Sequence, residues 1–190
     1  MSPWQQALTF ILDTVFSLTL FILLLRFFLQ WVNAAKTNPI TQTIFKIAQP
    51  LIWPFEKICP QWRRVSLATL IAVCVVELIK ITSLYSLNLF HLPHWDGLLL
   101  WSAGDIIENV CHLFFFVIIG RVILSWIRPQ QYNPALSLIY SLSDLILGPF
   151  ERVIPTIGGI QLAPIPALIL LQMIQIFIAT PLLQRGLGMA

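Results

Sequence analysis

The chain has 190 residues, of which 58% are hydrophobic and only 10% are charged, and its mean hydropathy is +0.85. Soluble domains carry about 25% charged residues, so this composition excludes an ordinary soluble protein and indicates an integral membrane protein. The net charge of +3 is small and its basic residues are scattered, which argues against a nucleic-acid partner, and three cysteines provide no disulfide framework.

Residues 7–32 form the first apolar run and are predicted to span the membrane. At 1.5 Å per residue, a helix of this length crosses a hydrocarbon core of about 30 Å with some tilt. Its charged residues are Asp13 near the start and Arg26 near the end, and Trp31 suits the interfacial aromatic belt. The run is too long for a signal-peptide core and no basic stretch precedes it, so we expect a retained membrane helix.

The loop at residues 33–66 is too polar and too rich in proline to span. Its apolar residues recur at helical spacing, which predicts an amphipathic helix lying in the membrane interface; they are Ile40, Ile44, Ile47, Leu51 and Phe55. Because proline lacks a backbone N–H, we expect Pro50 and Pro54 to end or kink this helix.

Residues 67–89 are predicted to form the second span, which carries Glu77 and Lys80. The two residues are three positions apart and therefore share one helical face, where they can neutralise each other inside the bilayer. Intramembrane charges are also candidates for an ion or proton relay. We favour a pair that fixes the rotation of the helix, because the corresponding residues of the second half are the uncharged Gln172 and Gln175.

The second half follows the same order. The apolar stretch at residues 98–101 is too short to cross and is expected to stay at the interface. Residues 106–127 are predicted to form the third span, with Glu108 at its start and Arg121 towards its end. Residues 128–163 form a second amphipathic loop, in which helix is not expected to run unbroken through Pro149, and residues 164–183 form the last span.

The two halves repeat one motif at a fixed offset of 95 residues. Ten of the 35 positions between Arg26 and Pro60 are identical to those between Arg121 and Pro155, without a gap. The first copy contains Arg26, Trp31, Asn38, Pro39, Pro54, Glu56 and Pro60, and the second contains Arg121, Trp126, Asn133, Pro134, Pro149, Glu151 and Pro155. The sequence thus predicts an all-α membrane protein with four transmembrane helices in two tandem repeats, residues 1–95 and 96–190.

The basic residues predict the orientation of the four spans. The two long loops hold seven lysines and arginines, whereas the opposite side holds only Arg185. The positive-inside rule places these loops in the cytoplasm and both termini outside. A repeat of two spans returns to its starting side, so the halves are expected to be parallel repeats about an axis along the membrane normal.

The repeated motif resembles that of the YggT (YlmG-like) family of small integral membrane proteins. The second copy carries the family's pattern nearly whole, in Arg121, Trp126, Asn133, Pro134, Asp144, Pro149, Arg152, Pro155, Gly158, Gly159 and Pro164. Gln161 stands where the family has an aspartate, and in the first copy Arg63 and Arg64 replace the glycine pair and Thr69 replaces the last proline. The resemblance implies a bacterial inner-membrane protein of a kind tied loosely to osmotic stress, potassium handling, cell division or plastid organisation, without an established catalytic mechanism.

Two functions remain open from the residues. The first is a non-enzymatic membrane scaffold or assembly factor, and the second is a small homo-oligomeric ion channel or transporter component. The expected partners are the bilayer, anionic lipids, and further copies of the chain or other membrane proteins. We expect no enzymatic activity, cofactor or metal, because the sequence has no phosphate loop, nucleophile elbow or zinc-ligand spacing. Arg26 and Arg121 have three readings: ion pairs with Glu56 and Glu151, binding of anionic headgroups, or snorkelling alone.

Overall fold

The computed structural model describes residues 2–57, 59, 66–89, 94–127, 133–154 and 161–189, and within them all regular structure is helical. Pro60, Pro155, Gly158 and Gly159 of the repeated motif lie outside the described residues. In chain order the elements are α1 (Pro3–Trp31), α2 (Pro39–Glu56), α3 (Leu67–Leu89), α4 (Trp95–Ile127), α5 (Pro134–Val153), α6 (Pro164–Ile174), the π-helical segment η1 (Gln175–Ala179) and α7 (Thr180–Met189).

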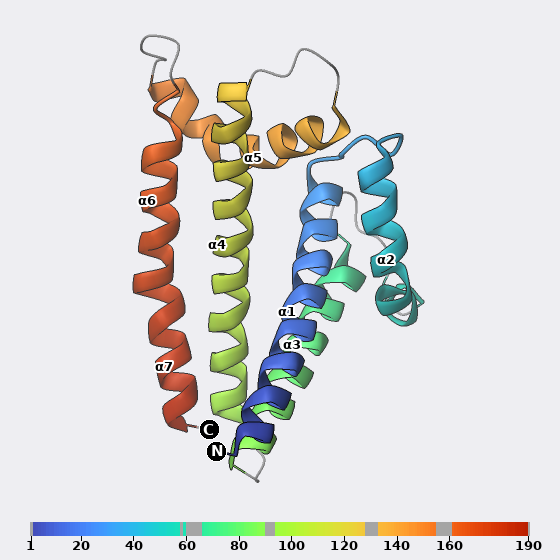
Figure 1. Ribbon diagram of the computed structural model, residues 1–190, viewed down its shortest axis with the longest axis vertical. Coiled ribbons are helices and arrows are strands. Elements are labelled where there is room, and N and C mark those ends of the chain that lie inside the picture. Colours follow the sequence, from blue (N-terminus) through green and yellow to red (C-terminus); the bar gives the residue numbers. More distant parts are fainter. Residues whose placement is uncertain are drawn as a thin grey trace.

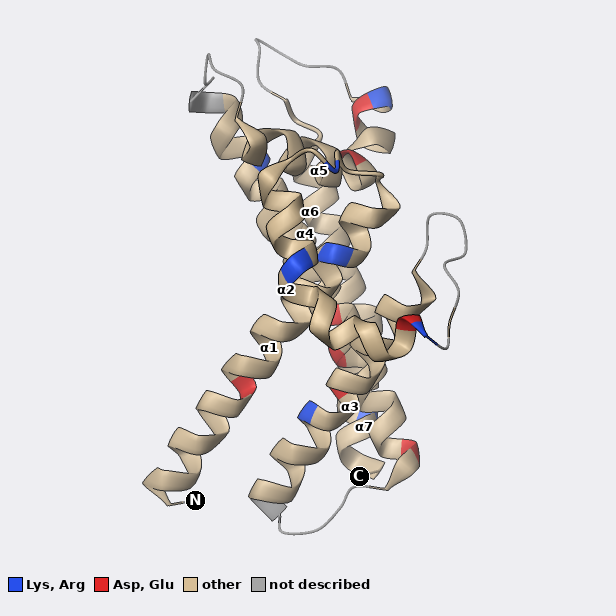
Figure 2. Cartoon of the chain, turned by 90° about the vertical axis from the view of Figure 1, so that its right-hand side faces the viewer, with Lys and Arg blue, Asp and Glu red and all other residues tan. Residues whose placement is uncertain are grey.

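Four helical stretches are long and apolar enough to cross a membrane, which confirms a multi-pass membrane protein. They are Pro3–Trp31, Leu67–Leu87, Trp95–Ser125 and Pro164–Met189, the last made of α6, η1 and α7 in succession. Figure 1 shows both termini at one end of the bundle, with α5 lying across the opposite end of α4 and α2 beside α1. Figure 2 shows how few charged residues interrupt the four spans.

The repeated Asn-Pro dipeptide begins both α2 and α5. Asn38 caps α2 by accepting a hydrogen bond from the Ile40 N–H at 2.9 Å, and Asn133 caps α5 by accepting one from the Ala135 N–H at 2.9 Å. In each case the following proline occupies the first helical position, where its missing N–H costs nothing. The motif therefore fixes the residue at which each helix starts.

Of the two effects expected of the prolines, ending the helix is wrong, and a kink stays a prediction. α2 continues through Pro50 and Pro54, and α5 continues through Pro149. A proline removes one backbone hydrogen bond, and polar groups of neighbouring helices can satisfy the carbonyls that it disturbs. Arg26 of α1 places a donor beside the carbonyl that Pro50 disturbs, that of Lys46: its Nη1 donates to the preceding carbonyl, that of Phe45, at 3.0 Å.

The helix of the third span begins earlier than residue 106, the start expected from the sequence, and it includes residues 98–101. α4 begins at Trp95 and runs without interruption for 33 residues, so this stretch belongs to the third span. Leu98 and Ser102 in its first turns are buried. The longer helix brings Asp105 into the span, where Lys80 of α3 neutralises it at 2.8 Å.

α4 is the central helix and contacts α1, α3, α5, α6, η1 and α7. Two glycines allow α7 and η1 to approach it closely. A Cβ atom at Gly186 would lie 2.5 Å from the backbone nitrogen of Trp101, and one at Gly104 would lie 3.0 Å from the Ala179 carbonyl oxygen. Small residues at helix contacts let backbones approach where lipid supplies no hydrophobic driving force. Gly186 packs against backbone atoms, which no change of side-chain rotamer can move.

We therefore expect Gly186→Ala to force α7 away from α4 and to destabilise the protein by about 1–3 kcal/mol, the usual cost of overpacking. The measurement is thermal unfolding in detergent micelles, followed by tryptophan fluorescence. Gly188→Ala is the matched control, because a Cβ atom at that position, in the same helix, meets nothing within 4 Å. Equal melting temperatures for the two variants would contradict the tight α4–α7 contact.

Candidate functional site

Arg26 ties α2 to α1. Its side chain is buried in the C-terminal part of α1, and its Nη2 lies 3.1 Å from Oε1 of Glu56. Nη1 donates to Oε1 of Gln49 at 3.0 Å as well as to the Phe45 carbonyl. Gln49 in turn donates to the second oxygen of Glu56 at 2.8 Å, so arginine, amide and carboxylate form a closed network. The phenyl ring of Phe45 lies 4.9 Å from the guanidinium carbon and completes this first arginine cluster.

Arg121 ties α5 to α4 through a second arginine cluster. Its side chain is also buried, and its Nη2 lies 2.7 Å from Oε1 of Glu151. Nη1 donates to the Ser143 hydroxyl at 2.8 Å and pairs with the Asp144 carboxylate. The ring of Tyr140 lies 4.9 Å from the guanidinium carbon.

The two arginine clusters use corresponding residues. The aromatic ring is Phe45 or Tyr140, the nearer polar partner is Gln49 or Asp144, and the farther carboxylate is Glu56 or Glu151, each pair 95 positions apart. They differ in charge, because Arg26 faces one carboxylate and Arg121 faces two. Burying a guanidinium costs free energy unless its donors are paired, and bidentate or networked carboxylates are its best partners. Ion pairing is therefore the geometry that the described residues show, and the arginines do not merely snorkel.

The intramembrane charges are arranged differently from the expectation. Glu77 and Lys80 were expected to neutralise each other, but Nζ of Lys80 lies 2.8 Å from Oδ2 of Asp105 on α4 and 3.6 Å from Oδ1 of Asp13 on α1. Neither oxygen of Glu77 has a hydrogen-bond partner among the described residues, although its side chain is fully buried. The lysine reaches across to the neighbouring helices because α4 extends far enough to offer Asp105.

The remaining residues of the repeated motif lie at the ends of the helices. Trp31 is half-exposed at the end of α1 and contacts the ring of Phe27. Asn38 has a second role, since its Nδ2 donates to the Pro134 carbonyl at 2.8 Å and joins the start of α2 to the start of α5. Arg152 is exposed in the last turn of α5, where a cation suits the helix dipole. Trp126 belongs to α4, but its side chain lies outside the described part of the structure.

Sequence reasoning missed several partners. Gln49 and Ser143 carried no stated role, and Asp144 was noted only as part of the family pattern. A signal was present, because Gln49 and Asp144 occupy the same position of the repeat and both are polar. Asp105 had no such signal, since the corresponding residue of the first half is Phe10.

A cleft of about 550 Å³ opens between α1 and α2 beside the first arginine cluster. It is lined by polar side chains as well as apolar ones, including Gln30, Asn33, Lys36 and Gln42. Within the described residues, no three His, Cys, Asp or Glu side chains are placed to hold a metal ion together. The interactions that the described residues form at this site are ion pairs and hydrogen bonds between helices.

Comparison with known proteins gives one family. A model of the CCB3/YggT family matches residues 5–87 and again residues 100–182, so the two matches start 95 residues apart. The uncharacterized protein PA0392 of Pseudomonas aeruginosa is 34% identical over 179 residues, which cover 92% of this chain and 89% of that protein. The uncharacterized protein YggT of Escherichia coli K12 is 32% identical over 184 residues, which cover 96% of this chain and 94% of that protein. No solved structure matches.

The arginine clusters predict a difference between charge exchanges in the two halves. Arg26→Glu or Glu56→Arg alone leaves like charges facing each other and should destabilise the protein by about 3 kcal/mol, as loss of one partner of a buried pair does. The double exchange Arg26→Glu with Glu56→Arg should restore part of this loss. The double exchange of Arg121 with Glu151 should restore less, because Asp144 then faces a new carboxylate.

Unfolding in mixed micelles measures these differences, and adding Asp144→Asn to the second double exchange should improve its recovery. Arg152→Glu is the control, since that side chain is exposed one residue after Glu151. Wild-type stability of both Arg26→Glu and Arg121→Glu would show that the two arginines only snorkel.

Proposed function

We propose that this chain, which belongs to the CCB3/YggT family, is a non-enzymatic membrane scaffold or assembly factor that presents α2 and α5 to partners. One observation carries the proposal: each amphipathic helix is held against a span by a buried arginine and its carboxylate. A helix fixed in this way loses little conformational entropy when a partner binds. Neither arginine cluster contains a nucleophile with a base beside it, so the geometry favours binding over catalysis.

The proposed architecture is two tandem two-span repeats with parallel orientation. Three observations support it: the two matches to the family model start 95 residues apart, the arginine clusters use residues 95 apart, and the Asn-Pro caps begin α2 and α5 in the same way. A duplicated unit presents two similar helices, which suits a protein that holds two partners or two copies of one partner.

The proposed location is the bacterial inner membrane, with the loops that carry α2 and α5 in the cytoplasm. Relatives from Pseudomonas aeruginosa and Escherichia coli support a bacterial source, and the loops carry all seven lysines and arginines that lie outside the four candidate spans. Anionic lipids of the inner leaflet attract such residues.

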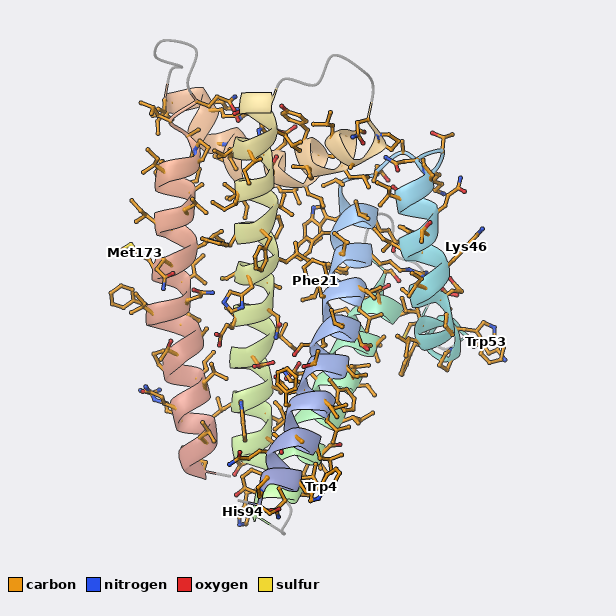
Figure 3. The ribbon with its side chains drawn as sticks, in the orientation of Figure 1. Trp4, Phe21, Lys46, Trp53, His94 and Met173 are labelled. Atoms are coloured by element: carbon orange, nitrogen blue, oxygen red, sulfur yellow. The ribbon has the colours of Figure 1, made fainter. Side chains whose placement is uncertain are left out.

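The exposed side of α2 is the proposed contact surface. Trp53 is 56% exposed and Ile47 is 52% exposed, and Nζ of Lys57 lies 3.7 Å from the Trp53 ring. Figure 3 shows Trp53 and Lys46 pointing away from the bundle. Aromatic and basic side chains together suit the headgroup region, so the proposed partners are anionic lipids and other membrane proteins or further copies of the chain.

The alternative is a small homo-oligomeric channel or transporter component, for potassium or for osmotic homeostasis. The charges of Asp13, Glu77, Lys80 and Asp105 within the spans favour it, because ionisable residues inside a membrane commonly mark an ion pathway. One chain has too few polar residues along its four spans to line a wide aqueous path, so transport would require several copies.

The orientation predicts that a reporter fused after Ala190 acts outside the cytoplasm. Alkaline phosphatase at this position should be active, and a fluorescent protein that matures only in the cytoplasm should stay dark. The same reporters inserted at residue 130 provide the reciprocal control. Strong cytoplasmic fluorescence from the C-terminal fusion would contradict the proposed orientation or the number of spans.

The scaffold proposal predicts discrete protein partners for α2. A photo-crosslinking amino acid in place of Trp53 should give protein adducts of fixed mass in cells, whereas one in place of Phe177, 69% exposed in η1, should label lipid. Arg26→Gln should weaken the Trp53 adducts severalfold without removing the protein from the membrane, because it frees α2 from α1.

A liposome assay distinguishes the scaffold from the alternative, a channel or transporter component. The scaffold should leave potassium flux at the level of empty liposomes. Potassium flux that the double variant Glu77→Gln with Lys80→Gln abolishes would establish the channel function instead. This variant is a matched control, because it installs the residues that the second half carries at the corresponding positions, Gln172 and Gln175.

A further inference from the structure

Glu77 is a buried acid at the centre of a span. It is the middle residue of the candidate span Leu67–Leu87, its relative exposure is 0%, and neither carboxylate oxygen has a hydrogen-bond partner among the described residues. An unpaired carboxylate at this depth is costly, because neither water nor a donor compensates its charge. Such a carboxylate is a candidate site for binding a proton or a cation.

The titratable groups that act on Glu77 come from α1, α3 and α4. Asp105 reaches it from α4 and Asp13 from α1, while Lys80 and Cys74 share its own helix. The ammonium of Lys80 forms ion pairs with the other two acids, since it lies 2.8 Å from Asp105 and 3.6 Å from Asp13. Asp13, Glu77, Lys80 and Asp105 form a charge cluster within the spans.

The cluster has more acids than bases. Three carboxylates surround one ammonium, so full ionisation would leave two uncompensated negative charges within the membrane. A proton on Glu77 removes one of them. It also supplies the missing hydrogen bond, because a protonated carboxyl group becomes a donor and Asp105 lies within reach as its acceptor.

We propose that Glu77 is a proton-binding site within the membrane, which donates a hydrogen bond to Asp105 when protonated and captures the Lys80 ammonium when it releases its proton. The O–H bond of the Glu77 carboxyl group breaks, the proton leaves to water, and the electron pair stays on the carboxylate. Asp13, whose side chain is 52% exposed, is the most accessible acid of the cluster and relays the proton. The ammonium then moves one helical turn along α3, from Asp105 to Glu77.

A proton fits this site better than a metal cation. The ammonium of Lys80 occupies the space between the acids and repels another cation, and no set of three acids among the described residues is placed to bind a metal. The proton also has a structural consequence. Lys80 and Asp105 join α3 to α4, so the state of Glu77 controls one bond between the first and second halves of the chain.

Infrared spectroscopy of the intact protein in lipid bilayers tests the proposal, because the C=O stretch of a protonated carboxyl group is separate from that of a carboxylate. The wild-type protein at neutral pH should show this band, and alkaline pH should remove it. Glu77→Gln, which mimics the protonated acid, should fold, melt within a few degrees of the wild type, and lack the band. Glu108→Gln is the control, since this acid lies on α4 and its side chain is 38% exposed; the band should remain.

Each other outcome overturns the proposal. Persistence of the band in Glu77→Gln would place the proton on another acid, and absence of the band from the wild type would leave Glu77 ionised. If sodium or potassium at constant ionic strength raised the melting temperature of the wild type but not of Glu77→Gln, the ligand would be a metal cation. Asp105→Asn serves as a second variant: it should shift the frequency of the Glu77 band by changing its acceptor, and an unchanged frequency would contradict the hydrogen bond.

Discussion

A guanidinium buried at the end of a membrane helix constrains the rest of this structure. Arginine stays charged at any physiological pH, and burying its guanidinium away from water costs free energy unless acceptors pair with its charge. Arg26 and Arg121 are 4% and 5% exposed, so each requires acceptors that its own helix does not supply. α2 and α5 supply them and must therefore lie against the spans. α2 and α5 are thus held by the arginines as well as by the apolar residues that they bury in the core.

The spacing of the acceptors explains the prolines. Gln49 and Glu56 are seven residues apart, and so are Asp144 and Glu151, a rise of about 10 Å in a straight helix. One guanidinium contacts both members of each pair. Bending of the helix between the two acceptors shortens that path, and proline is the usual cause of a bend. Prolines lie in these intervals, Pro50 and Pro54 in α2 and Pro149 in α5, so we interpret them as the bends that fit each helix around its arginine.

The sequence predicts what depends on composition and local chemistry. Four apolar spans follow from hydropathy, and pairing of Arg121 with Glu151 follows from the repeat, since a conserved spacing of 30 residues within one chain requires a common geometry. Contacts between side chains of different helices cannot be predicted from the sequence in this way, because hydropathy fixes neither the rotation nor the register of one span against another. Asp105 illustrates this limit: it meets Lys80 only because α4 starts at Trp95. The prolines illustrate a second limit, because the continuation of a helix through a proline depends on hydrogen-bond donors and acceptors of other helices.

Two polar contacts that differ between the halves lie where the halves meet. Two similar units placed side by side need contacts that neither has alone, and such contacts have no reason to appear twice. Asn38 donates to the Pro134 carbonyl at one end of the molecule, while Lys80 pairs with Asp105 deep in the bundle, and both bonds join the first half to the second. Asn133 and Gln175 occupy the corresponding positions of the second half. Gln175 is uncharged, and among the described residues neither side chain forms a bond to the first half. The repeated arginines thus hold α2 and α5 against the spans, and two bonds without a counterpart among the described residues, those of Asn38 and Lys80, join the first half of the chain to the second.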